Sequence, residues 1–526
     1  MIKPYKSLLI LLYTVILLGL VTFFFPAQIR FSDTFSLKSF SLPSIFLKED
    51  INYADITDIQ QKFKNADDQN LENIPSGSDT VVVSDTNTTL ASATEPTISA
   101  NNDWAKPTSA AEILSDTLEE RYRIQYPPGS EAMLADFFRA LQQADKQLIR
   151  ILHYGDSQIE GDRITAMFRH KIQNRFGGCG AGMLPLTDPL GNRSSIVQQS
   201  DGVMQRYKVF GPDFSRRVAN RHGLLGSYFK MNFTYTTKDT TAEHQNDSVP
   251  KLIYHTKKNQ QAHLNLYRSS LAFPRENRFQ HVKILYRNPE SDFDMHIGTK
   301  PDTSGKYKIS RDSSANFKVF DYTFNESFVR LHISFASRKS PEFYGICLDC
   351  NTGVAVDNMP FRGSSGIEFT RMNTQLLREQ VQKLHVKLMV LQFGVNVVPF
   401  ITKDYSFYEN QFYQQLRFLK NLSPDVAILV VGVSDMSRKV NGEYVSYPNV
   451  ANIRDAQRKA AFRAGCAFWD LYEAMGGENS MPSWVFAKPA LANKDFTHFT
   501  PRGASLVAEM LYKALMSDYG KLNLIQ

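Results

Sequence analysis

Apolar residues recur at helical spacing in two stretches on either side of a short apolar run near residue 150. Over 133–141 and again over 164–176 the apolar positions repeat every three or four residues, which predicts two amphipathic helices. Between them, residues 148–154 read Leu-Ile-Arg-Ile-Leu-His-Tyr, which is typical of a buried strand. The order helix, strand, turn and helix predicts an α/β domain.

The same alternation returns after residue 350. Three helical patterns each lead into a short apolar run, and a closing helix follows: 371–384 into 388–393, 407–419 into 426–433, 453–464 into 466–469, and then 501–516. Strands that alternate with helices favour a parallel sheet covered by helices.

Between about residues 191 and 350 the pattern changes. Short alternating or apolar runs are separated by polar, turn-rich segments, and no helical run of three turns stands out. This spacing predicts an antiparallel β-sandwich inserted into the α/β domain. The aromatic residues of the insertion have the chemistry to stack on sugars, but we expect most of them to fill the sandwich core: Tyr228, Phe229, Tyr235, Tyr286 and Phe293.

The N-terminus carries an apolar run of the kind that enters a membrane. Lys3 and Lys6 precede an uncharged stretch over 7–25, which is longer than a usual signal-peptide core and has no clean cleavage site after it. We expect a signal anchor over 1–30, with a cleaved signal peptide as the alternative; either way the bulk of the protein is exported. Residues 31–110 are predicted to be a flexible linker, because 75–109 are rich in Ser, Thr, Asn and Asp.

Composition narrows the class of protein. The 526 residues carry a net charge of +7, whereas residues 1–110 hold 8 Lys+Arg and 12 Asp+Glu, so the folded remainder is the more basic part. No basic tracts indicate nucleic acid as a partner, and four cysteines exclude a disulfide scaffold. Cys347 and Cys350 form no zinc pattern and are expected to be buried strand residues, whereas a pairing of Cys179 with Cys466 stays open.

Residues with catalytic chemistry follow the predicted strands. Ser157 follows the first strand in HYGDSQIEGDR, Asn396 follows a later one in VLQFGVN, and Asp495 and His498 lie in DFTHFTPRG before the last helix. A serine needs a base, and the base needs a group that orients it. Of the eleven histidines, His498 alone has an Asp three positions earlier. Each element by itself also fits a turn or a helix cap; their common placement at strand ends favours a hydrolase site.

These motifs resemble those of the SGNH (GDSL-type) hydrolase superfamily. Gly155-Asp156-Ser157 matches its first block, Gly394-Val395-Asn396 its third, and Asp495-Phe496-Thr497-His498 its fifth, over about 130–190 and 351–526. The resemblance implies Ser157 as nucleophile, His498 as base and Asp495 as its orienter. The N–H groups of Ser157 and Gly363, with the side chain of Asn396, would form the oxyanion hole; Gly366 is the alternative to Gly363. Gln158 departs from the family, in which many members have Leu.

The resemblance also implies a fold and a substrate class. We expect a flavodoxin-like, three-layer SGNH domain over 111–190 and 351–526, interrupted by a carbohydrate-binding-like sandwich over 191–350. This layout is similar to bacterial peptidoglycan O-acetylesterases, whose glycine-rich segment after the first helix resembles 175–182. A phosphate loop is disfavoured there, since the run lacks Lys-Ser/Thr and follows a helix; a close-packed turn with positive φ fits it better.

The function expected is therefore the removal of O-acetyl groups from cell-wall glycan, without a metal or cofactor. The expected location is the periplasmic side of a bacterial inner membrane, to which the N-terminal helix anchors the chain. A membrane acyl-transfer protein is a further expected partner. Two alternatives remain: a polysaccharide O-acetyltransferase that uses the same triad, and a non-catalytic glycan-binding envelope protein.

Overall fold

The computed structural model describes most of the chain after residue 117 and short pieces before it. The described residues are 9, 11–14, 16–17, 28–30, 36–38, 51–63, 118–130, 132–188, 193–201, 203–211, 220–232, 234–238, 252–256, 260–299, 305–324 and 330–525. They belong to two compact units, Met1–Asn52 and Tyr53–Gln526. In the first unit, β1 (Gln28–Arg30) pairs antiparallel with β2 (Ser36–Lys38).

The central sheet of the second unit is parallel except at one edge. In spatial order its described strands are β18 (Gly353–Pro360), β4 (Leu148–Gly155), β19 (Val386–Gln392), β20 (Ala427–Val431), β23 (Ala467–Trp469) and the antiparallel β3 (Ile124–Gln125). The parallel strands thus stand 2-1-3-4-5 in chain order, which is the flavodoxin-like order. The predicted α/β domain is confirmed, and its strand order reverses between β4 and β19.

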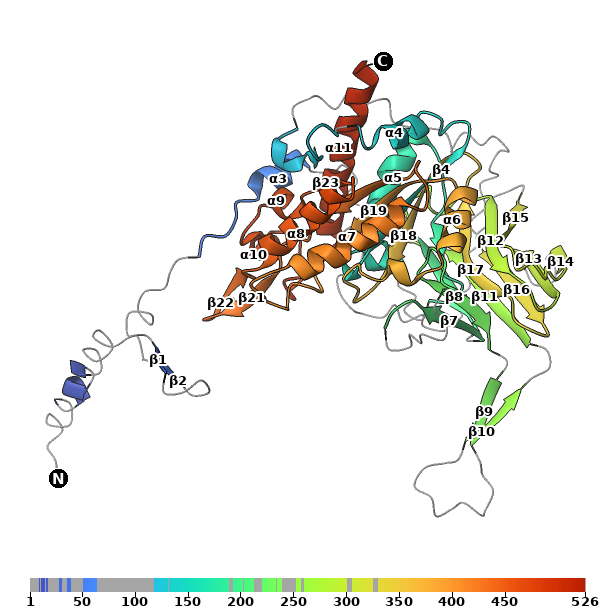
Figure 1. Ribbon diagram of the computed structural model, residues 1–526, viewed down its shortest axis with the longest axis horizontal. Coiled ribbons are helices and arrows are strands. Elements are labelled where there is room, and N and C mark those ends of the chain that lie inside the picture. Colours follow the sequence, from blue (N-terminus) through green and yellow to red (C-terminus); the bar gives the residue numbers. More distant parts are fainter. Residues whose placement is uncertain are drawn as a thin grey trace, which may run out of the picture. The chain divides into compact units, whose positions relative to one another are not determined.

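Helices cover both faces of this sheet (Figure 1). In β19, Leu388 and Val390 join the core beneath α4, α5 and α11, whereas Met389 and Leu391 join the core beneath α6, α7 and α8. All four side chains are fully buried, as expected for a strand covered on two sides. The helices are α4 (Ala135–Leu141), α5 (Thr165–Phe176), α6 (Thr374–Lys383), α7 (Ser406–Lys420), α8 (Val450–Arg463), α9 (Leu471–Ala474), α10 (Ser480–Phe486) and α11 (Pro501–Ile525).

The inserted segment is a β-sandwich, as predicted. Phe343 of one sheet touches Phe293 and Phe335 of the other, with ring centroids 5.8 and 4.5 Å apart. One sheet has the order β14 (Gly305–Ile309), β13 (Phe293–Gly298), β16 (Arg330–Ser337), β11 (Gln260–Arg268), β6 (Ile196–Ser200); the other has the order β15 (Lys318–Thr323), β12 (His281–Arg287), β17 (Glu342–Asp349), β8 (Ser227–Met231), β7 (Met204–Lys208). A separate hairpin pairs β9 (Thr234–Lys238) with β10 (Leu252–Thr256).

The sandwich aromatics are core residues, in agreement with the prediction. Tyr228, Phe229, Tyr286 and Phe293 are buried, whereas the side chain of Tyr235 lies outside the described residues. The sandwich also begins before residue 191, because β5 (Gly182–Leu184) pairs with β17. Three residues are too few to show the alternation by which a strand is recognised.

Part of the predicted linker is folded. Residues 53–63 include the short helix α3 (Thr57–Lys62), and Ile59 and Phe63 are buried in the core beneath α11. Lys62 pairs with Glu119, and the Lys513 ammonium lies 4.9 Å from the Phe63 ring centroid. The prediction of a flexible linker is therefore wrong for this segment. Because polar residues flank it on both sides, its few apolar positions do not stand out in the sequence. Residues 64–110 lie outside the described residues.

The signal-anchor prediction lies mostly outside the described residues, which include only residues 9, 11–14 and 16–17 of the apolar run. Within the described part of the chain, no helix has the length and apolarity required to cross a membrane.

A disulfide links Cys179 to Cys350, so the pairing of Cys179 with Cys466 is not formed. Cys347 and Cys466 are free and buried. Cys347 is a buried residue of β17, as predicted, whereas the prediction of a strand residue is wrong for Cys350, which lies just beyond the end of β17 and bonds to the glycine-rich run. The predicted close-packed turn explains the approach, because a Cβ on Gly180, where φ is +81°, would lie 2.0 Å from the carbonyl oxygen of Leu348. The disulfide thus joins the two places where the chain passes between the central sheet and the sandwich.

Candidate active site

The turn after β4 lies where the strand order of the central sheet reverses. Ligands bind outside the carboxyl ends of the strands at such a point. Ser157 begins the 3₁₀ segment η4 (Ser157–Asp162). The buried Asp156 carboxylate accepts hydrogen bonds from the N–H of Gln158 at 3.0 Å and from the N–H groups of Gly394 and Val395. Burial raises the pKa of Asp156 to about 7, although these bonds act in the opposite direction. The turns after β4 and β19 are thereby held together.

The structure brings the three predicted triad residues into one hydrogen-bonded chain. Ser157 Oγ lies 2.7 Å from His498 Nε2, and His498 Nδ1 lies 2.7 Å from Asp495 Oδ2. With its proton on Nδ1, His498 donates to Asp495 and leaves Nε2 to accept the serine hydroxyl proton. The side chains of His498 and Asp495 are 27% and 49% exposed, so a substrate can approach from solvent. This is the arrangement that activates a serine nucleophile.

Asp495 is held in its charged form. Burial acts to raise the pKa of its carboxyl group, but hydrogen bonds from the His498 ring and from the N–H groups of His498 and Thr497 outweigh it. Both N–H groups lie 3.0 Å from Oδ1. The pKa of Asp495 therefore lies below its ordinary value, and the group is a carboxylate at neutral pH.

The loop that carries Asp495 and His498, here called the catalytic loop, contains a strained residue. Phe496, between Asp495 and Thr497, has a φ of +54°, which bulky residues rarely adopt. Its ring stacks on Tyr444 with centroids 3.6 Å apart, and its carbonyl accepts the N–H of Ser437 at 3.1 Å. Both partners belong to the hairpin of β21 (Ser437–Val440) and β22 (Glu443–Ser446). The hairpin thus fixes the loop that carries Asp495 and His498.

Gly363 and Asn396 lie on neighbouring loops of the same edge. Gly363 has a φ of +83° in the turn Phe361–Ser364, and no atom lies within 4 Å of a Cβ built there. Gly366, by contrast, faces the rings of Phe393 and Phe412. Asn396 Nδ2 donates to the carbonyl of Ser364 at 2.9 Å. The loops of Gly363 and Asn396 are therefore joined; their part in an oxyanion hole stays a prediction, and Gly363 has the open surroundings that this role requires.

Gln158 is a positioning residue that the sequence did not reveal. Its buried side-chain amide donates to the carbonyl of Thr497 at 2.7 Å and to Ser434 Oγ at 3.1 Å. It therefore ties the residue after the nucleophile to the residue before His498. The sequence feature that could have indicated this role is Gln158 itself, a polar residue at a position where many family members carry Leu.

Replacing Gln158 by Leu is expected to lower kcat for a small acetyl ester by about 10- to 100-fold with little change in KM. The reason is that His498 loses its fixed distance from Ser157, and small displacements of catalytic groups have effects of this size. Steady-state kinetics would measure it. Ser434→Ala, which removes one of the two hydrogen bonds, should have a smaller effect, and an unchanged kcat in Gln158→Leu would contradict the role.

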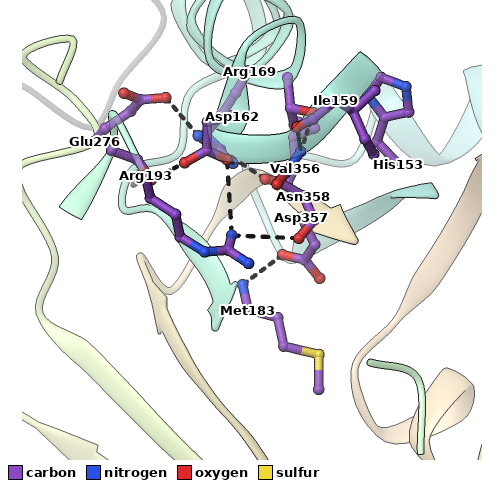
Figure 2. Close-up of polar contacts among 12 residues, drawn as sticks. His153, Ile159, Asp162, Arg169, Met183, Arg193, Glu276, Val356, Asp357 and Asn358 are labelled. Atoms are coloured by element: carbon purple, nitrogen blue, oxygen red, sulfur yellow. Dashed lines mark hydrogen bonds and ion pairs between the residues drawn. The ribbon is translucent and has the colours of Figure 1, made fainter. Parts of the chain in front are cut away.

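A buried ion network lies behind the nucleophile turn (Figure 2). Arg169 of α5 donates to the carbonyl of Val356 at 2.7 Å, to Glu276 at 2.6 Å and to Asp162 at 3.2 Å. The three charged side chains have no exposed surface. Burial raises the pKa of Glu276 to about 7, although Arg169 acts to lower it. Because Asp162 ends η4 and Glu276 belongs to the insertion, Arg169 connects the nucleophile turn to the inserted segment.

No group of three or more His, Cys, Asp or Glu side chains in the described residues is arranged to hold a metal ion.

Residues 333–506 match the GDSL-like Lipase/Acylhydrolase family. The matched segment contains Gly363, Asn396, Asp495 and His498, whereas Ser157 precedes it. No curated protein matches this chain.

Among solved structures that are similar to this chain, one shows a shared fold. A peptidoglycan O-acetylesterase is similar with a TM-score of 0.54 and 18% identity, over 74% of this chain and 95% of that one. A family two carbohydrate esterase from Cellvibrio japonicus has a TM-score of 0.20 and 8% identity, over 62% and 99%. A GDSL-like lipase from Parabacteroides merdae has a TM-score of 0.23 and 16% identity, over 31% and 74%. Of these three, the first is close enough to show the common fold.

Proposed function

We propose that this chain, whose residues 333–506 match the GDSL-like Lipase/Acylhydrolase family, is an SGNH-type esterase that removes O-acetyl groups from peptidoglycan or a closely related cell-wall glycan. The observation that carries the proposal is the hydrogen-bonded chain from Ser157 through His498 to Asp495 at the carboxyl edge of the sheet. The choice of glycan is supported by the shared fold with a peptidoglycan O-acetylesterase, a match that covers 74% of this chain and 95% of that one.

The proposed reaction has two steps. Ser157 Oγ attacks the acetyl carbonyl carbon while His498 Nε2 takes the hydroxyl proton, and the sugar oxygen then leaves with that proton. Water next attacks the acetyl-enzyme, His498 takes a proton from the water, and acetate leaves as the proton returns to Ser157. Asp495 stabilises the imidazolium that forms in both steps.

The oxyanion of each tetrahedral intermediate needs hydrogen-bond donors. In this proposal they are the N–H groups of Ser157 and Gly363 and the side chain of Asn396. Asn396 uses one amide proton for the carbonyl of Ser364, and its second proton is available for the oxyanion. The bond to Ser364 would also fix the direction of the amide.

We extend the proposal to location. The apolar run near the N-terminus supports export and attachment to a bacterial inner membrane, with the catalytic domain in the periplasm. The Cys179–Cys350 disulfide is in keeping with an oxidising compartment. A membrane acyl-transfer protein as a partner, and the absence of a cofactor or nucleic-acid partner, belong to the same proposal.

The test is the release of acetate from O-acetylated peptidoglycan by the full chain, with Ser157→Ala as control and with a chito-oligosaccharide acceptor present or absent. Release that is lost in the variant and indifferent to the acceptor is the expected result. Transfer of acetyl to the acceptor would instead make the protein a transferase. Turnover of a small acetyl ester without release from peptidoglycan would overturn the substrate, and glycan binding without any turnover would favour a binding protein.

A further inference from the structure

Large apolar side chains are exposed at several positions of the second unit. Among the described residues from 53 onward they are Tyr53, Phe400, Ile401, Phe407, Val440 and Phe486. None of them belongs to the described part of the sandwich, whose named aromatics are core residues. Contiguous exposed apolar patches mark interaction sites, whereas single exposed apolar residues are common on any protein surface. The residues of interest are therefore those that adjoin the loops of the candidate active site.

Two of these rings, Phe400 and Phe407, belong to segments that are bonded within, or to, the loops of Asn396 and Gly363. Phe400 is four residues beyond Asn396 and 74% exposed, and its carbonyl accepts the Tyr405 hydroxyl at 2.9 Å. Phe407, also 74% exposed, precedes Tyr408, whose hydroxyl donates to the carbonyl of Ser365 at 3.2 Å. Both rings therefore stand on ordered backbone that is bonded within, or directly to, the loops of Asn396 and Gly363.

A third ring lies on the His498 side. Phe486, at the end of α10, is 53% exposed. Its ring centroid lies 5.8 Å from that of Phe496, 6.5 Å from that of Tyr444 and 6.0 Å from that of Tyr53. Phe486 thus packs against the buried Phe496, which directly follows Asp495 in the loop that also carries His498. We call Phe400, Phe407 and Phe486 together the aromatic rim.

We infer that the aromatic rim forms sugar-binding subsites on both sides of the triad, which hold the pyranose rings of a glycan chain while an acetyl group on an internal sugar enters the site. The inference rests on the proposed function and specifies how that substrate is held. A glycan chain is long enough to contact rings beside the loop of Asn396 and beside the loop of His498, whereas a small ester is not.

The chemistry of the rim favours sugar over lipid or protein. The C–H faces of a pyranose pack on an aromatic face, and a Phe ring loses little conformational freedom when it is covered. Ile401 has no ring and lies next to Phe400 with 49% of its surface exposed. A membrane or protein partner would use Ile401 and Phe400 alike, whereas a sugar chain uses the rings.

The experiment measures binding to purified peptidoglycan sacculi by the full-length Ser157→Ala protein. Phe400→Leu, Phe407→Leu and Phe486→Leu, which stay apolar but lose the ring, should each weaken binding about fivefold. Phe→Tyr at the same positions should retain it, and Ile401→Ala is the matched control that should leave it unchanged. With active Ser157, the same Leu variants should lower the ratio of kcat/KM on polymer to kcat/KM on p-nitrophenyl acetate by the same factor.

The outcomes separate this inference from the proposed function. Binding that depends on the rings, without acetate release, would support the sugar-binding subsites and contradict the proposed esterase function. Acetate release that is unchanged in all three Leu variants would support the esterase function and contradict the subsites. Leu variants that bind like the parent, loss of binding in Ile401→Ala, or binding to phosphatidylethanolamine–phosphatidylglycerol vesicles that depends on Phe400 and Ile401, would overturn the subsites. Phe400 and Phe407 are too exposed for their substitution to unfold the domain.

Discussion

Ser157→Ala is expected to lower kcat for an activated acetyl ester by about 10⁴- to 10⁶-fold while the free energy of unfolding changes by at most about 1 kcal/mol. The activity falls because the acetyl-enzyme cannot form without Oγ, and the remaining donors give the residual rate that serine hydrolases keep when a triad member is lost. Stability changes little because the one hydrogen bond that Oγ makes is to His498 Nε2. Initial rates and urea unfolding would measure the two effects.

The triad should also behave as one unit. Because Ser157 and His498 act in the same proton transfer, the double variant Ser157→Ala/His498→Ala should be no slower than either single variant. Ser406→Ala is a matched control, since this serine also begins a helix at the carboxyl edge of the sheet but bonds to Asp404 instead. Turnover retained in Ser157→Ala would show that the nucleophile lies elsewhere.

Features that depend on neighbouring residues could be predicted from the sequence. The period of apolar residues predicted the helices and strands of the parallel sheet, and the strand-end positions of Ser157 and His498 placed both on one edge. The Asp495–His498 contact spans three residues, so that spacing alone could suggest it. These predictions required one property beyond local pattern, namely that parallel strands end at a common edge.

Features that depend on contacts between distant residues could not be predicted in this way. Gln158 bonds to a carbonyl 339 residues away, and the Cys179–Cys350 disulfide spans 171 residues. Tyr444 stacks on Phe496 through a hairpin whose strands have four residues each, too few for a clear alternation. The folded segment 53–63 is held by the burial of Ile59 and Phe63, two apolar residues that pack in a core formed by residues beyond 120.

A second large effect is expected on the free energy of unfolding when the buried ion network loses Arg169. Arg169→Met should lower the free energy of unfolding at pH 7 by about 3–5 kcal/mol, because two buried carboxylates, Asp162 and Glu276, lose their common partner. Arg193, 4.0 Å from Asp162, remains as a weaker partner. Urea unfolding of both proteins would measure the difference. Arg139→Met is the matched control, since Arg139 pairs with Asp136 on the surface and should contribute little.

The pH dependence identifies the cause of this loss. In the intact protein, burial acts to raise the pKa of Asp162, but Arg169 and Arg193 outweigh it and the pKa lies below its ordinary value. Without Arg169, the folded-state pKa of Asp162 should rise, and that of Glu276, which already lies above its ordinary value in the intact protein, should rise further. A carboxyl group with a raised folded-state pKa destabilises the fold at high pH and ceases to do so when it is protonated. The stability difference between Arg169→Met and the parent should therefore narrow from pH 8 to pH 5, and Arg169→Met/Glu276→Gln should recover part of it at pH 8. A difference that stays constant over this range would mean that lost packing, not uncompensated charge, is the cause.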